Sequence, residues 1–117
     1  MEWKVKTNYL ENMSAGIKFY EEVIKQRLET NPFPEGLAND LANVITVIEM
    51  TYSSIPQEYA PLKSNILSMR TGLKMLERIV KEKRIDDVAS AQTFFEGKMN
   101  MVAISIDALS KKQSKSL

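Results

Sequence analysis

Residues 28–41, LETNPFPEGLANDL, contain a break that we expect to reverse the direction of the chain. Pro32 and Pro34 fix the backbone φ angle and remove two backbone donors, and Gly36 follows them, so this stretch predicts a turn. On both sides of the break, apolar residues recur every three or four positions, which is the spacing of one face of an α-helix. The chain is therefore predicted to run along one helix, turn, and return along a second.

Four such apolar stripes follow one another along the sequence. Further breaks are predicted at 53–60, around Pro56, and at 84–87, where Asp86 or Asp87 can cap the start of the last helix. The predicted helices span about residues 9–29, 36–54, 61–83 and 87–111, and residues 112–117 are predicted to form a flexible basic tail. This pattern is typical of an antiparallel, up-and-down four-helix bundle, so we predict an all-α fold in a single domain.

Each stripe supplies residues to the predicted hydrophobic core. The first supplies Leu10, Met13, Ile17, Tyr20, Ile24 and Leu28. The second supplies Leu37, Leu41, Val44, Ile45, Ile48, Tyr52 and Ile55, and the third supplies Leu62, Ile66, Met69, Leu73, Leu76 and Val80. The fourth supplies Val88, Phe95, Met99, Val102, Ile106 and Leu109.

The residue types that the sequence lacks restrict its chemistry. Without His or Cys, the chain cannot form a conventional zinc site, a disulfide, a Ser-His or Cys-His nucleophile, or the Glu-x-x-His ligands of di-iron bundles. No glycine-rich phosphate-binding loop is present. We therefore expect a protein that is not an enzyme and that holds no metal or cofactor. A purely carboxylate metal site, or an enzyme based on lysine or tyrosine, is the alternative.

The sequence predicts a cytoplasmic protein without a membrane span. The charge-free runs 41–48 and 99–106 are far shorter than the roughly 20 residues that cross a bilayer. No apolar run follows the first lysines, as a signal peptide would require. The absence of cysteine fits a reducing compartment.

The last predicted helix carries more apolar residues than one face needs. Phe95 lies on the face predicted to meet the core, and a second apolar group lies on the opposite side. That group consists of Phe94, Met101, Ile104 and Ala108, with Met75 and Ile79 of the third helix beside it. We predict that this group contacts another protein, and homodimerisation about a two-fold axis is its simplest use. The alternative is that the helix lies centrally and both faces are internal.

Charge is distributed unevenly, although the net charge is only +1. Residues 28–62 contain acidic residues and no lysine or arginine, whereas residues 63–84 contain seven basic residues and only two acidic ones. One side of the third helix carries Lys63, Arg70, Lys74 and Lys81. Such a stripe can bind phosphates or another anionic surface. The plainer interpretation is a solvated face that complements the acidic second helix of the same copy or another.

These patterns predict a non-enzymatic protein-binding module, such as an adaptor, a chaperone or an inhibitor of another protein. Its contact surface would be the second apolar face of the last helix. The alternative function is a nucleic-acid-associated helical subunit that uses the basic stripe and the lysine-rich tail. No motif in the sequence identifies the partner.

Overall fold

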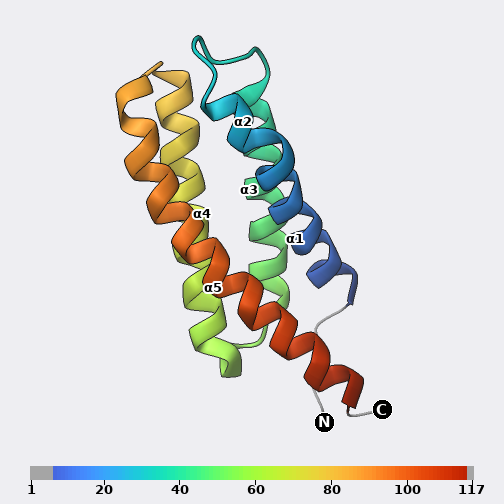
Figure 1. Ribbon diagram of the computed structural model, residues 1–117. Helices are drawn as coiled ribbons and strands as arrows, with labels where there is room; N and C mark the ends of the chain where they lie inside the picture. The colour runs from blue at the N-terminus through green and yellow to red at the C-terminus, as the bar shows by residue number, and fades with distance from the viewer. Residues whose placement is uncertain (1–6, 116–117) are drawn as a thin grey trace.

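The arms of an antiparallel helical bundle correspond to the four apolar stripes of the sequence (Figure 1). The computed structural model describes the backbone of residues 7–115 and the side chains of residues 11–57 and 59–108. There is no strand within residues 7–115, and the predicted all-α, up-and-down fold is confirmed. The first arm consists of α1 (Thr7–Phe19), η1 (Tyr20–Ile24) and α2 (Lys25–Leu28). The other arms are α3 (Leu37–Ser54), α4 (Ala60–Lys81) and α5 (Val88–Lys115), with short 3₁₀ turns η2 (Gln57–Tyr59) and η3 (Ile85–Asp87) between them.

The first arm differs from the continuous helix predicted over 9–29, because its middle turn, η1, is π-helical. In a π-helix the backbone hydrogen bonds span five residues instead of four, so the turn accommodates one extra residue. Tyr20 and Ile24 of this turn are both buried. Neither proline nor glycine lies within the turn, and the spacing of Ile17, Tyr20 and Ile24 also fits a regular α-helix. The apolar pattern therefore could not reveal it.

The predicted bounds of α3 and α4 are correct to within two residues, but the predicted end of the last helix is wrong. Residues 112–115 continue α5 instead of forming part of a flexible tail. This segment contains no proline or glycine. Lysines near the C-terminal end of a helix also interact favourably with its dipole, so a polar composition did not end the helix. Residues 116–117 lie outside the described part of the chain.

The end of α4 is closed by two backbone hydrogen bonds that reach back into its last turn. The N–H of Lys83 donates to Val80 at 3.2 Å, and the N–H of Arg84 donates to Ile79 at 2.9 Å. In this motif the residue after the cap adopts the left-handed conformation, and it is usually glycine. Lys83 adopts it here, with φ of 55°, at a cost of roughly 1–2 kcal/mol relative to a right-handed backbone. The sharp turn leads through η3 into α5.

The predicted core is confirmed at almost every position whose side chain is described. Tyr52 is the exception, because it is only half-buried. Leu10 and Leu109 lie outside the described side chains. The core also includes Ala91 and the side chain of Thr51, whose hydroxyl donates to the Val47 carbonyl at 2.9 Å.

The four arms do not pack equally on one another. α4 packs extensively on both α3 and α5, whereas α1 packs mainly on α3 and meets α5 over a smaller area. Figure 1 shows α5 crossing the bundle obliquely, from the end of α4 toward the start of α1. α4 and α5 approach each other closely at Gly72, where an added Cβ would lie 3.0 Å from Phe95 Cβ and 3.1 Å from Phe95 Cα. Glycine is required there because any side chain would push the two helices apart.

Candidate functional site

The second apolar group of the last helix lies on the surface. Phe94, Met101 and Ile104 are 40%, 48% and 71% exposed, whereas Phe95 is 1% exposed. Ala108 is also exposed, and Met75 of α4 is 45% exposed. The alternative in which both faces of the helix are internal is therefore wrong. We call Phe94, Met101, Ile104, Ala108 and Met75 the outer apolar face.

Ile79 does not belong to this face, although the sequence placed it there. It is 2% exposed and forms part of the core. Ile79 follows Gly72 by two helical turns, so both residues lie on the side of α4 that packs against α5. The close packing of α5 on this side of α4 buries Ile79, which the periodicity of α4 alone did not indicate.

Phe94 connects the outer apolar face to the packing of α4 and α5. Its Cδ1 atom would lie 3.2 Å from a Cβ at Gly72, so the edge of the ring rests on the backbone of α4. At Gly97, one turn further along α5, an added Cβ would meet no atom within 4 Å. The surface between Phe94 and Met101 is therefore open, and a partner could approach the α5 backbone closely there.

The basic stripe of the third predicted helix is largely engaged within the chain. Arg70 Nε lies 2.7 Å from Glu49 Oε2 of α3, and Lys81 Nζ lies 3.8 Å from Glu77 Oε2. Lys63 Nζ lies 4.5 Å from the centroid of the Tyr52 ring, within the range of a cation–π interaction. Among the described side chains, Lys74 forms no ion pair. The Arg70–Glu49 pair agrees with the interpretation that the basic α4 complements the acidic α3 of the same copy.

A polar cluster joins the first arm to α5. The Tyr20 hydroxyl donates to Glu96 Oε2 at 2.8 Å, and Lys25 Nζ donates to Glu96 Oε1 at 3.3 Å. The Tyr20 ring packs edge-on against Phe95, with 4.6 Å between the ring centroids. The amide of Gln92 lies nearby, and its Nε2 atom is buried without a hydrogen-bond partner. The apolar spacing predicts that Tyr20 lies in the core, but it does not identify Glu96 as the partner that a buried tyrosine hydroxyl needs.

Burial raises the pKa of the Tyr20 hydroxyl far above its usual range, and the hydrogen bond to Glu96 raises it further. Both effects favour the neutral hydroxyl, because the ionised form would lose hydration and would face the Glu96 carboxylate. Tyr20 is therefore a hydrogen-bond donor at physiological pH. The cluster has the character of a structural connection between two arms.

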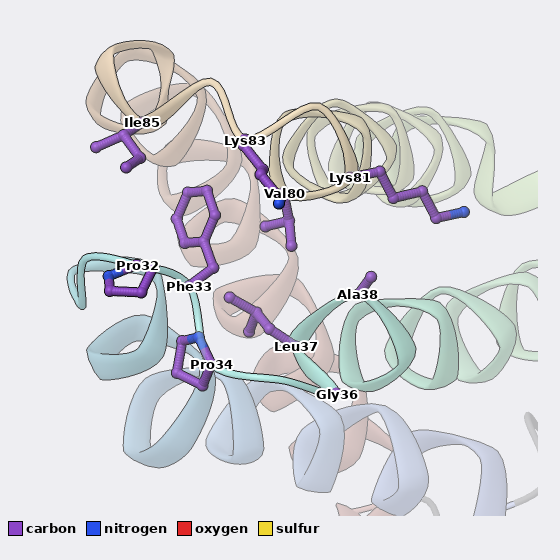
Figure 2. Close-up of a pocket in the computed structure, with 10 residues that line it drawn as sticks. All are labelled: Pro32, Phe33, Pro34, Gly36, Leu37, Ala38, Val80, Lys81, Lys83 and Ile85. Carbon is purple, nitrogen blue, oxygen red and sulfur yellow. The ribbon is translucent and has the colours of Figure 1, made fainter.

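A pocket of about 320 Å³ lies at the end of the bundle that holds the break before α3. Its walls come from residues 32–38, between α2 and α3, and from residues 80–85, at the end of α4 (Figure 2). Phe33, Leu37, Val80 and Ile85 supply apolar surface. This pocket could not be predicted from the sequence. Pro32 and Pro34 indicate a turn, but they do not indicate which other segment of the chain the turn contacts. We call it the loop pocket.

Two further tests bear on the function. In the part of the chain that the structure describes, no three acidic side chains are grouped so that they could hold a metal ion. Over the same residues, no helix combines the length and the apolar content that crossing a bilayer requires. Neither a protein-family model, nor a curated protein, nor a solved structure matches the chain.

Proposed function

We propose that the chain is a non-catalytic protein-binding module that contacts its partner through the outer apolar face. The observation that supports this proposal is the exposure of Phe94, Met101 and Ile104 at helical spacing along one side of α5. Single exposed apolar residues are common on protein surfaces, but a group of them on one side of a helix is typical of an interaction site. An adaptor, a chaperone or an inhibitor would use such a surface.

The size of the face favours a modest interface. Residues 94–108 extend over roughly 21 Å of α5 at 1.5 Å per residue. Complete burial of one large apolar side chain is worth about 1.5–3 kcal/mol, and these side chains are already partly covered. Burial of these side chains would together contribute several kcal/mol to the free energy of association. The loss of translational freedom on association offsets part of this contribution. Polar contacts around the face are therefore needed for a stable complex, and flexible methionines help it to fit a partner's surface.

A second copy of the chain is the simplest partner. About a two-fold axis, identical faces meet each other, so one apolar patch is enough to form a closed dimer. The open surface at Gly97 would let the two α5 helices approach closely. Phe94 and Met101, on either side of Gly97, would then lie at the centre of the interface, where truncation usually has its largest effect.

The test compares two methionines that differ in position but little in exposure. Met101 is 48% exposed on the outer apolar face, and Met50 is 53% exposed on α3. Light scattering over a range of concentrations should show a wild-type dimer, a Met101→Asp monomer and a Met50→Asp dimer. A Met50→Asp monomer, or a Met101→Asp dimer, would contradict the assignment of the interface to α5.

A wild-type monomer would exclude the second copy as the partner and would require a different protein. Affinity capture from the native host would then use the same three chains. A protein retained by the wild type and by Met50→Asp, but not by Met101→Asp, would support the proposed face. Equal retention by all three chains would place the binding surface elsewhere.

A further inference from the structure

We propose that the loop pocket binds a small organic monoanion, a carboxylate carried on an aromatic or branched aliphatic group. This site is separate from the outer apolar face, and the inference does not depend on the proposed protein-binding function. Three observations support it: the size and lining of the pocket, the position of its lysines, and the backbone conformation of Lys83.

The size and lining of the pocket suit the apolar part of such a ligand. Its volume of about 320 Å³ lies at the lower end of the range for small-molecule sites, which is roughly 300–1,000 Å³. The ring of Phe33 and the side chains of Leu37 and Val80 point toward one another across the pocket (Figure 2). Ile85 remains 39% exposed at its edge. Leu37 and Val80 are already buried, so an aromatic or branched group would cover mainly the exposed parts of Phe33 and Ile85 and remove them from water.

The charges around the pocket suit an anion. Lys81 and Lys83 line it, and no acidic side chain does. Figure 2 shows Lys83 extending over the pocket toward Val80, whereas Lys81 extends away from it. Lys81 also lies 3.8 Å from Glu77, while Lys83 forms no ion pair among the described side chains. Lys83 therefore supplies one unpaired positive charge beside an apolar surface, which matches a ligand with a single carboxylate.

The conformation of Lys83 separates the role of its side chain from the needs of the turn. Its φ of 55° lies in the left-handed region, where glycine is preferred. The two backbone hydrogen bonds that close α4 require only the backbone of this residue. A lysine at this position is thus less favourable for folding than a glycine, and among the described side chains that of Lys83 forms no hydrogen bond or ion pair that would offset this cost. Binding of an anionic ligand would explain why a lysine, with its ammonium group, stands at position 83.

The experiment uses 3-phenylpropionate as the probe and the neutral 3-phenylpropanamide as its matched control. Backbone amide signals of the ¹⁵N-labelled full chain are followed during titration with each compound. We expect the carboxylate to shift signals of residues 32–38 and 80–85, and the amide to bind about ten-fold more weakly. Equal affinity for the two compounds, no saturable shifts, or shifts centred on α5 would overturn the proposal.

Substitutions of Lys83 keep the test independent of folding. Lys83→Gly should raise the midpoint of thermal unfolding by a few degrees, while weakening the binding of 3-phenylpropionate about ten-fold. Lys83→Asn, which also tolerates the left-handed conformation, should weaken binding similarly. Lys81→Gln should change the affinity less than two-fold. Unchanged affinity in both Lys83 variants, or an equal loss in Lys81→Gln, would overturn the assignment of Lys83. Met101→Asp should bind the probe normally, which separates this site from the proposed protein interface.

Discussion

The hydroxyl of Tyr20 lies 2.8 Å from Glu96 Oε2, although 76 residues separate the two along the chain. Tyr20 opens the π-helical turn of the first arm, and Glu96 lies in the first half of α5. Lys25, at the start of α2, lies 3.3 Å from the other oxygen of the same carboxylate. The two contacts come from the first residue of the π-helical turn and from the residue after its end, so they orient this turn toward α5.

Removing the Tyr20 hydroxyl should weaken the bundle measurably. Tyr20→Phe keeps the ring against Phe95 but removes the hydrogen bond to Glu96. Because Glu96 is partly exposed and keeps Lys25, we expect a loss of about 1 kcal/mol in the free energy of unfolding. Glu96→Gln should lose less, since its amide oxygen still accepts the hydroxyl. Urea denaturation measures both, and a larger loss for Glu96→Gln than for Tyr20→Phe would contradict this account.

The raised pKa of Tyr20 predicts a loss of stability at alkaline pH. The unfolded chain releases the phenolic proton near the ordinary tyrosine pKa of about 10, whereas the folded chain retains it. The contribution of Tyr20 is therefore complete below about pH 10 and is lost as the pH rises further, by up to about 1.4 kcal/mol per pH unit. Urea denaturation at several alkaline pH values should show a smaller dependence on pH in Tyr20→Phe. The same dependence in both chains would contradict the prediction.

Two glycines of the last two helices should respond oppositely to a methyl group. Gly72→Ala would place Cβ 3.0 Å from Phe95 Cβ, so α4 and α5 must move apart, at a cost of about 1–3 kcal/mol. Gly97→Ala meets no atom within 4 Å and should stabilise α5 by up to about 1 kcal/mol. Thermal unfolding measures both effects. Destabilisation by Gly97→Ala in a monomeric background would contradict the open surface at that position.

The neighbouring phenylalanines of α5 should differ sharply in their effect on stability. Phe95 is 1% exposed, so Phe95→Ala should cost about 3–5 kcal/mol. Phe94 is 40% exposed and rests on Gly72 with one edge, so Phe94→Ala should cost on the order of 1 kcal/mol. Circular dichroism during denaturation provides the comparison. Similar losses in the two variants would mean that Phe94 is as important to the core as Phe95.

The engaged basic stripe predicts weak binding to nucleic acid. Arg70 and Lys81 pair with carboxylates of the same chain, which leaves little charge for phosphates. Titrations with DNA and RNA at several salt concentrations should therefore show weak binding with a shallow dependence on salt. Tight binding with a steep salt dependence, reduced by Lys74→Glu but not by Lys18→Glu on α1, would favour the nucleic-acid alternative.

The repeating apolar positions were sufficient to predict the architecture. The stripes placed Phe95 in the core and Phe94 outside it, because two adjacent helical positions point about 100° apart. They could not predict the burial of Ile79, which depends on how α5 packs against α4. They also could not predict the π-helical turn, since Ile17, Tyr20 and Ile24 have the same spacing in a regular helix. Periodicity reports which face of one helix is apolar, not the angle at which another helix meets it.

The loop pocket could not be predicted from the sequence, for a related reason. Its two walls, residues 32–38 and 80–85, are far apart in the chain and meet only because the bundle brings their ends together. The positive φ of Lys83 could not be predicted from the sequence either. A lysine near the C-terminal end of a helix usually interacts favourably with the helix dipole, so it does not indicate a left-handed residue. A pocket formed by two segments that are far apart in the chain can be identified only when the packing of the helices is known.

The unequal packing of the four arms has a consequence for sub-global opening. α4 packs on both α3 and α5, whereas the first arm packs mainly on α3 and meets α5 over a smaller area that includes the Tyr20–Glu96 contact. Because the first arm packs less extensively on its neighbours than α4 does on α3 and α5 together, its detachment should need less free energy than release of α4 from both neighbours. Amide hydrogens of α1 should accordingly exchange with solvent faster than those of α4. Such an opening would leave α3, α4 and α5 packed as a three-helix unit, with the first arm detached.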